Sequence, residues 1–310
     1  MNVEIKGQPR SVLLIGVTDA GKTNFLSRLW LALGVGNGIL ASAGLPSDLD
    51  YLKTGSDHLL KGEFAPHTPR DVRDATEIPV KNTSEGREFG TLIVPDLPGE
   101  QVLSVFKTRQ WSSEWENRIG PGCGCLLFVR VDSKELIAPL DWLNCPLQLG
   151  STPATAVPEK DITDKAKPPT QVVLVDWLQF LRKAFTARVH GAYKPRIGIV
   201  VAAWDRAPTD QKNAGPGAWV ASNLPLLAQY VHANDDEFEF AYFGVSVTSG
   251  DFAADPDFKK SYLKGNPRNA GEVVHSLSAV VETSSDMTMP VAWALGLAVG
   301  TVPGSMNSDD

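Results

Sequence analysis

Residues 11–23 read "SVLLIGVTDAGKT", and they decide the fold. The first six residues form a short apolar run that ends in glycine, which predicts a buried strand. The residues that follow the loop, "KTNFLSRLWLAL" at 22–33, carry apolar side chains at helical spacing. A strand, a glycine-containing loop and a helix in this order predict the first unit of an α/β fold.

The loop between this strand and this helix fits the pattern Gly-x-x-x-x-Gly-Lys-Thr. Glycine lets the backbone wrap closely around a phosphate, and the helix N-terminus adds N–H groups and a favourable dipole. We therefore predict that the loop binds the phosphates of a nucleotide. The expected contacts are Gly16, Thr18, Asp19, Ala20, Gly21, Lys22, Thr23 and Asn24, with Lys22 at the β- and γ-phosphates and Thr23 as a Mg²⁺ ligand.

Further elements follow along the chain. Two runs flanking "TSEG" at 83–86 predict a hairpin, and other apolar runs predict buried strands and helices. The hairpin strands are 76–82 and 87–96; later strands are 125–131, 196–203 and 238–247; helices are 48–62, 171–185, 218–231, 271–282 and 290–297. This order predicts an α/β P-loop NTPase fold with a mostly parallel central sheet, one antiparallel hairpin edge strand, and helices on both faces.

We expect a single domain over residues 1–310, with three additions to its core. A long switch-region insertion covers about 34–75, and sequence leaves open whether it is an ordered surface or a disordered lid. A flexible insertion rich in Pro, Thr and charge covers about 138–170, and a loose tail covers about 301–310.

Composition excludes several classes of function. The net charge is −7, which gives no broad footprint for nucleic acid. The first ten residues lack the apolar run of a signal peptide, and "VAWALGLAV" at 291–299 is too short to span a bilayer. We therefore expect a cytoplasmic protein without a membrane anchor. The three cysteines, Cys123, Cys125 and Cys145, are expected to be structural, because no zinc-ligand spacing is present.

Three more motifs lie at or just beyond the ends of predicted strands. Asp96 and Gly99 lie in "PDLPGE" at 95–100, Asp205 lies in "AAWDRA" at 202–207, and Ser246 lies in "GVSVTSGD" at 244–251. In an open α/β sheet, ligands bind beyond the carboxyl ends of the strands. These positions are therefore expected to gather beside the phosphate-binding loop.

The order of these four motifs resembles that of the TRAFAC class of P-loop GTPases, the group of Ras-like and translation-factor GTPases, from about residue 11 to 249. More loosely, "DLPGE", "AAWD" and "MPVAWAL" are similar to the double-GTPase families proposed for bacterial conflict systems. The resemblance implies binding of GTP and GDP, Mg²⁺-dependent hydrolysis of GTP, and a role as a molecular switch that is slow without a partner.

The same resemblance implies roles for individual residues. Asp96 would hold Mg²⁺ through water, and the Gly99 N–H would sense the γ-phosphate. Asp205 would accept hydrogen bonds from guanine, and the loop at Ser246 would back the base. The Asn and Lys of the usual base motif are replaced by Ala202 and Ala203, so the guanine assignment depends on one carboxylate.

The resemblance also suggests catalytic groups. The switch threonine that closes over Mg²⁺ is Thr68 or Thr76, and we favour Thr76 because it begins the hairpin strand. Glu100 stands where Ras-like enzymes orient water, and it is equally compatible with a solvated carboxylate. Asp19 is expected to bind a monovalent cation such as K⁺ beside the β–γ bridge, whereas Thr18 would hinder an inserted arginine.

Two alternatives to a GTPase switch stay open. The chain can be a nucleotide-loaded adaptor with little turnover, in which 34–75 is a docking surface, or it can be an ATPase, because the base motif is incomplete. A protein effector or activator is expected in the switch and adaptor cases, and the sequence does not identify it.

Overall fold

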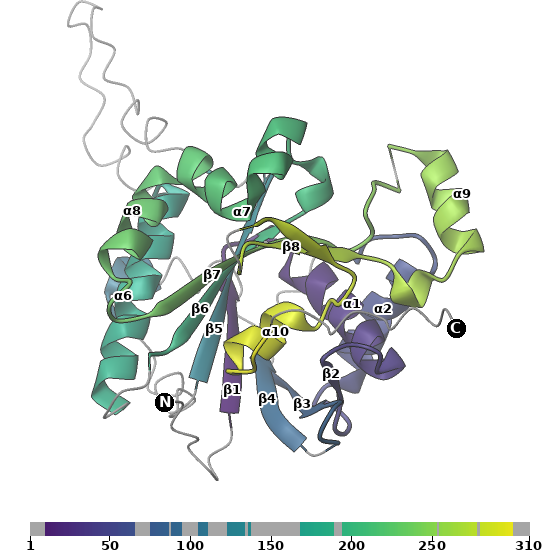
Figure 1. Ribbon diagram of the computed structural model, residues 1–310, viewed down its shortest axis with the longest axis horizontal. Coiled ribbons are helices and arrows are strands. Elements are labelled where there is room, and N and C mark those ends of the chain that lie inside the picture. Colours follow the sequence, from purple (N-terminus) through teal and green to yellow (C-terminus); the bar gives the residue numbers. More distant parts are fainter. Residues whose placement is uncertain are drawn as a thin grey trace, which may run out of the picture.

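A nine-stranded sheet runs through the protein and carries helices on both faces (Figure 1). The computed structural model describes residues 10–65, 75–86, 88–94, 105–110, 123–133, 136–137, 168–188, 194–252, 254–277 and 280–299. The strand order is β2-β3-β4-β1-β5-β6-β7-β8-β9. The strands are β1 Arg10–Gly16, β2 Leu40–Ser42, β3 Thr76–Asn82, β4 Glu88–Val94, β5 Cys123–Arg130, β6 Arg196–Ala202, β7 Glu239–Ser246, β8 Glu272–His275 and β9 Glu282–Ser284.

The centre of the sheet is parallel, as predicted. β4, β1, β5, β6 and β7 pair in parallel, while β2–β3–β4 and β7–β8–β9 pair antiparallel at the two edges. The predicted hairpin at 76–96 is confirmed as β3 and β4. The sheet has more antiparallel strands than predicted, because β2 and the β8–β9 hairpin extend its edges.

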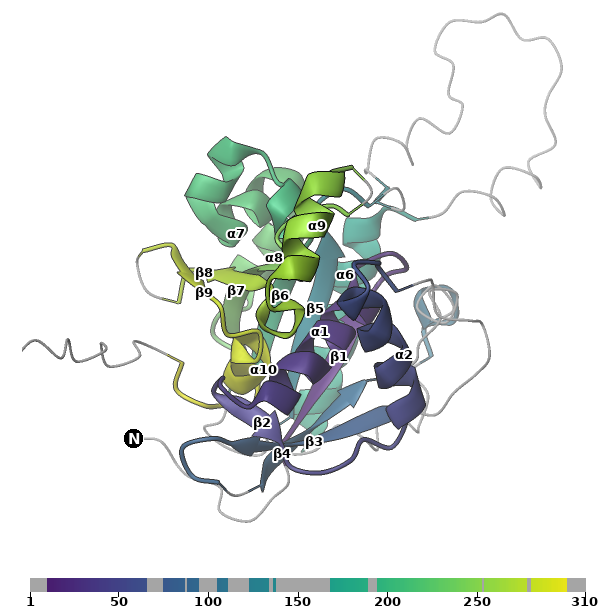
Figure 2. The same cartoon turned by 90° about the vertical axis from the view of Figure 1, so that its right-hand side faces the viewer.

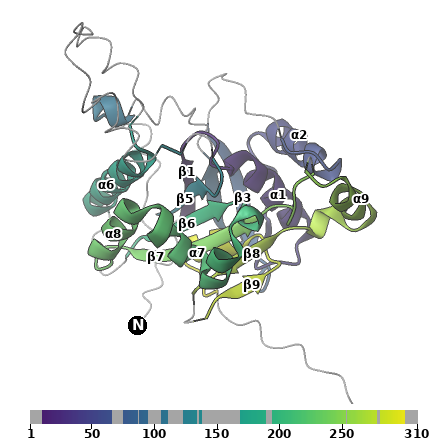
Figure 3. The ribbon, with the colours of Figure 1, turned by 90° about the horizontal axis from the view of Figure 1, so that it is seen from above.

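Helices cover the sheet in two groups, which Figure 3 separates clearly. In Figure 3, α1, α2 and α9 lie on one side, opposite α6 and α8. The buried clusters place α10 on the face of α1 and α7 on the face of α6. Their bounds are α1 Lys22–Val35, α2 Leu49–Leu60, α6 Thr170–Arg188, α7 Thr209–Asn223, α8 Pro225–Ala233, α9 Pro256–Lys264 and α10 Met289–Ala294. Each face has its own buried apolar cluster, so the alternating side chains of the central strands are buried on both sides.

Two helix predictions were wrong. Residues 271–282 were expected to be a helix, but β8 occupies Glu272–His275 and pairs with the edge of β7. The segment is rich in valine, which packs well on a pleated sheet, and the open edge of β7 supplies hydrogen-bond partners. Residues 218–231 belong to two helices, because Leu224 takes a non-helical conformation before Pro225.

The part of the predicted switch-region insertion that the structure describes, residues 34–65, is ordered. It contributes β2 and α2, and α2 lies along α1 (Figure 2). The contact is close, because the Ser56 hydroxyl donates to the Ser27 carbonyl at 3.1 Å and a side chain at Gly55 would collide with Ser27. Residues 66–74, most of the 138–170 insertion, and the tail at 301–310 lie outside the described residues.

Cys123 and Cys125 are buried on β5, as predicted, and Cys145 lies outside the described residues. In the described ranges, no three His, Cys, Asp or Glu side chains come together as a metal-binding group. The described helices also include none with the length and apolar character needed to cross a membrane.

Candidate nucleotide-binding site

The carboxyl ends of the parallel strands lie together at one end of the sheet, and the predicted site residues that the structure describes lie there. Gly16 at the end of β1 pairs with Phe128 of β5, Arg130 at the end of β5 pairs with Ala202 of β6, and Ala202 pairs with Val245 of β7. The loops after Gly16, Arg130, Ala202 and Ser246 are therefore neighbours. Three of them carry residues that the sequence predicted to bind nucleotide.

The loop from Gly16 to Thr23 has no room for larger side chains at its two glycines. A Cβ at Gly16 would lie 2.8 Å from the Phe128 carbonyl oxygen. Gly21 has φ +87°, and a Cβ there would lie 2.8 Å from the Cβ of Ala202. The loop is therefore pressed against the ends of β5 and β6, which is a cradle that only glycine permits.

Lys22 is held inside this cradle. Its ammonium group donates to the carbonyl oxygens of Gly16 at 2.6 Å and Val17 at 3.1 Å. These partners fold the side chain back over the loop and place a positive charge beside its backbone N–H groups. An anion in the cradle would meet both kinds of donor.

Asn24 has a structural role in addition to its place in the first turn of α1. Its side-chain oxygen accepts a hydrogen bond from the Ala65 N–H at 2.9 Å. The amide thereby fastens the end of the 34–65 segment to the start of α1. Thr23 lies in the same turn, and its carbonyl accepts from the Ser27 hydroxyl at 2.9 Å.

Asp19 is engaged by side chains from a different strand end. Its backbone is in the left-handed region, with φ 60°. One carboxylate oxygen lies 2.8 Å from an Arg130 guanidinium nitrogen, and the other accepts from the Ser133 hydroxyl at 3.2 Å. Arg130 was not among the residues predicted from the sequence. The available signal was its position near the end of the predicted strand 125–131, on the same side of the sheet as the loop from Gly16 to Thr23, called the phosphate loop below.

Asp205 lies on a short 3-10 turn, η1 Trp204–Arg206, directly after β6. Burial raises the pKa of its carboxyl, and this effect is partly opposed by a hydrogen bond to its own backbone and by Lys212, Ser246 and Arg206. Lys212 also donates to the Asp205 carbonyl at 2.5 Å. Because ionisation of this carboxyl costs free energy in the protein without ligand, hydrogen-bond donors such as the N–H groups of guanine would stabilise its ionised form.

Ser246 ends β7 beside this turn and is fully buried. Its hydroxyl is near enough to favour the ionised form of Asp205, yet within the described part of the chain it has no hydrogen bond of normal geometry. A cavity of about 480 Å³ opens next to Asp205, and Lys212, Ser249 and Glu272 contribute to its wall. The Trp204 indole is itself buried and packs over Gly244.

The second predicted motif is described only in part. Thr76 begins β3, is buried, and pairs with Val94 at the end of β4. This places Thr76 beside the strand that leads to Asp96. Asp96, Gly99, Glu100 and Thr68 lie outside the described residues.

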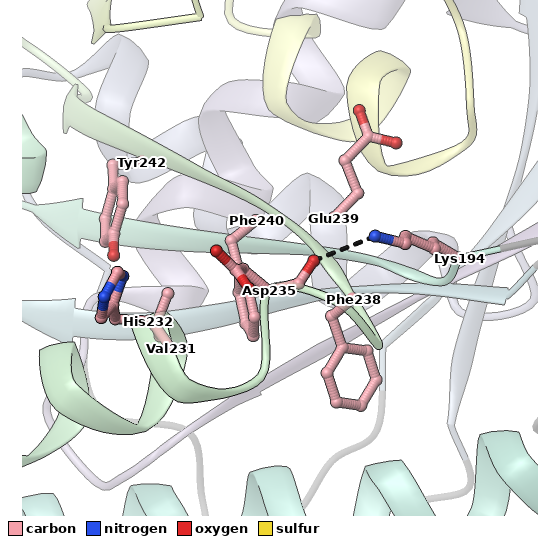
Figure 4. Close-up of a pocket in the computed structure, with 8 residues that line it drawn as sticks. All are labelled: Lys194, Val231, His232, Asp235, Phe238, Glu239, Phe240 and Tyr242. Carbon is pink, nitrogen blue, oxygen red and sulfur yellow. Dashed lines mark hydrogen bonds between the residues drawn. The ribbon is translucent and has the colours of Figure 1, made fainter.

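A second cavity, of about 470 Å³, lies near the amino ends of β6 and β7 (Figure 4). It is lined by Lys194, Val231, His232, Asp235, Phe238, Glu239, Phe240 and Tyr242. Lys194 donates to the Asp235 carbonyl at 3.1 Å, and burial raises the pKa of Tyr242. Glu239 begins β7 and Ser246 ends it, so the Glu239 side of this cavity lies about one strand length, roughly 23 Å, from Ser246.

Comparisons with known proteins place the chain in a family. Similar solved structures include the signal recognition particle receptor in its SRb-GTP/SRX complex from Chaetomium thermophilum, with 17% identity and a TM-score of 0.37 over 82% of this chain and 98% of that chain. Another is a bacterial selenocysteine-specific elongation factor, EF-Sec, with 12% identity and a TM-score of 0.30 over 87% of this chain and 34% of that chain. No curated protein matches the sequence. The model of the Double-GTPase 1 family matches residues 13–294, and the chain therefore belongs to this family.

Proposed function

We propose that the protein binds GTP and GDP and hydrolyses GTP with Mg²⁺ as a molecular switch. The observation that carries this proposal is that Lys22 and Asp205 lie at the same end of the sheet, where Gly21 of the Lys22 loop closely approaches Ala202 at the end of β6. Membership of a GTPase family supports guanine nucleotide as the ligand.

The phosphates would occupy the loop from Gly16 to Thr23. Its N–H groups and the Lys22 ammonium would compensate the negative charge, and Lys22 would exchange its carbonyl partners for β- and γ-phosphate oxygens. Thr23, Thr76 and Asp96 are the residues proposed to hold Mg²⁺. The metal ion, when bound, neutralises charge that develops on the phosphates.

The guanine base would lie against Asp205, with the loop at Ser246 behind it. An ionised Asp205 can accept two hydrogen bonds from one edge of guanine, whereas adenine offers no matching pair of donors there. This distinction supports GTP over ATP even though Ala202 and Ala203 replace the usual Asn and Lys.

Hydrolysis would need a positioned water and a group that senses the γ-phosphate. Glu100 is proposed to orient the water, Gly99 to contact the γ-phosphate, and Thr76 to close over the site. A K⁺ ion at Asp19 is the alternative to this arrangement, and it would share a carboxylate that already contacts Arg130 and Ser133. We expect slow turnover until a partner protein completes the site.

The ordered segment 34–65 favours one further possibility, a nucleotide-loaded adaptor that docks a partner on this surface. Such an adaptor would hydrolyse little of its bound GTP, whereas a switch would hydrolyse it. We also propose that the protein acts in the cytoplasm, as its composition suggests, and that it belongs to a bacterial conflict system, as the family resemblance suggests.

The first experiment identifies the nucleotide that copurifies with the protein and then measures competition between GTP and ATP. Lys22→Ala should abolish binding, while Lys53→Ala, at an exposed position on α2, should leave it unchanged. Preferential binding of ATP would contradict the role of Asp205. A single-turnover assay with bound GTP then separates the switch, which hydrolyses it, from the adaptor, which retains it.

A further inference from the structure

Five charged side chains form a continuous row across the carboxyl ends of the strands, beside the phosphate loop. Asp19 pairs with Arg130 at 2.8 Å, and Arg130 pairs with Asp132 at 3.0 Å. Asp132 in turn pairs with Arg206 at 2.8 Å, and Arg206 lies 3.7 Å from Asp251. The row starts in the phosphate loop and ends beyond β7, with Arg206 next to Asp205 in sequence.

The ion pair between Asp19 and Arg130 is partly shielded from water. The Arg130 side chain is 26% exposed and the Asp19 side chain is 22% exposed. Charges at such positions interact more strongly than those of fully exposed pairs, because less water screens them. Arg130 also has a fixed origin, since it is the last residue of β5 and its neighbour in β6 is Ala202.

A carboxylate inside a phosphate-binding loop creates an electrostatic problem. Asp19 has a left-handed backbone, and its carboxylate is held by Arg130 and Ser133. Its negative charge opposes a triphosphate unless a cation lies beside it. In the free protein Arg130 is that cation, and it contacts the carboxylate directly.

We propose that Arg130 is a positioning residue for the phosphate loop and that it serves as the built-in cation for Asp19. It neutralises the carboxylate, fixes the loop against the end of β5, and makes an added monovalent ion unnecessary. Asp132 holds the guanidinium from the other side and is itself held by Arg206, so the arginine is anchored before nucleotide binds. This inference rests on the proposed nucleotide binding and deepens it.

The test measures equilibrium binding of a fluorescent, non-hydrolysable GTP analogue to the full chain in NaCl and in KCl at equal ionic strength. The wild type should bind equally in both salts. Arg130→Ala should bind about tenfold or more weakly in NaCl, the size expected for losing one charge-assisted pair, and KCl should restore part of the loss. Arg130→Lys should retain most of the affinity, because a point charge can still face Asp19.

The decisive comparison is the double variant Asp19→Asn/Arg130→Ala. Removing the uncompensated carboxylate should return the affinity close to that of the wild type. A merely structural role for Arg130 would give no such rescue, and thermal unfolding of each variant shows whether it is folded. Arg182→Ala, which removes an arginine that pairs with Glu237 on the α6–α8 side, is the matched control and should bind normally.

The results separate the two levels of the proposal. If the wild type binds no guanine nucleotide, the proposed function fails. If the wild type binds but Arg130→Ala binds equally well, the role of Arg130 is refuted. A wild type that requires K⁺, or a double variant as weak as Arg130→Ala, would also refute it and would favour a monovalent ion at Asp19.

Discussion

Gly21→Ala tests the fit between the phosphate loop and the sheet. Gly21 has φ +87°, and a side chain there in this left-handed region costs about 1–2 kcal/mol. The added Cβ would also lie 2.8 Å from the Cβ of Ala202, and overpacking of this kind costs about 1–3 kcal/mol. We therefore expect a loss of about 2–5 kcal/mol in the free energy of unfolding, by addition of these two costs.

Gly36→Ala is the matched control, because Gly36 also has a positive φ, +71°, but a Cβ there would lie 3.7 Å from Ala41, an ordinary contact. It should cost only the conformational part, about 1–2 kcal/mol, and leave nucleotide binding intact. The difference between the two variants isolates the contact with Ala202. Urea unfolding of the free protein measures both free energies.

Nucleotide affinity gives the second measurement. In Gly21→Ala the loop must shift away from β6, and misplacing two charge-assisted hydrogen bonds should weaken GDP binding by about 100-fold or more. The double variant Gly21→Ala/Ala202→Gly removes the opposing Cβ, so its loss should be smaller than the sum of the single losses. Equal effects of Gly21→Ala and Gly36→Ala, or strict additivity with Ala202→Gly, would refute the reasoning.

Three further predictions concern Asp205 and Arg28. Asp205→Asn should raise the melting temperature of the free protein at neutral pH, because burial raises the pKa of this carboxyl and its ionised form opposes folding. The same variant should bind GDP more weakly. A lower melting temperature would contradict burial as the cause of the raised pKa. For the wild type, the affinity for GDP should fall as the pH drops through the raised pKa of Asp205, because only the ionised carboxylate accepts both guanine N–H groups. The fall should begin at a higher pH than for an ordinary aspartate. Isothermal titration at several pH values measures this affinity, and Asp205→Asn, whose affinity should not change with pH in this range, is the reference. Arg28→Met should destabilise the fold by about 2–4 kcal/mol in chemical denaturation, because the buried guanidinium donates hydrogen bonds to the Val247 and Pro267 carbonyls and the Tyr262 hydroxyl. Arg268→Met, at an exposed position, should cost little.

The sequence predicted the centre of the fold correctly, and the reason is local. Buried parallel strands are continuous apolar runs, and the glycine, lysine and threonine of residues 16–23 have fixed spacing along the chain. Gly16, Asp205 and Ser246 could therefore be placed at strand ends, and Lys22 at the start of the first helix, without knowledge of the strand order. Asp96, Gly99 and Glu100 were chosen by the same reasoning, and their roles stay predictions.

Only the tertiary structure decided what is non-local. Residues 272–275 became β8 because the edge of β7 needed a hydrogen-bonding partner, and their own pattern is compatible with a helix. Asp19 and Arg130 are far apart in sequence, and the parallel pairing of β1 with β5 brings them into contact. The sequence alone predicted a loop for phosphates, because that motif is local; the strand order determined that Arg130 lies beside that loop.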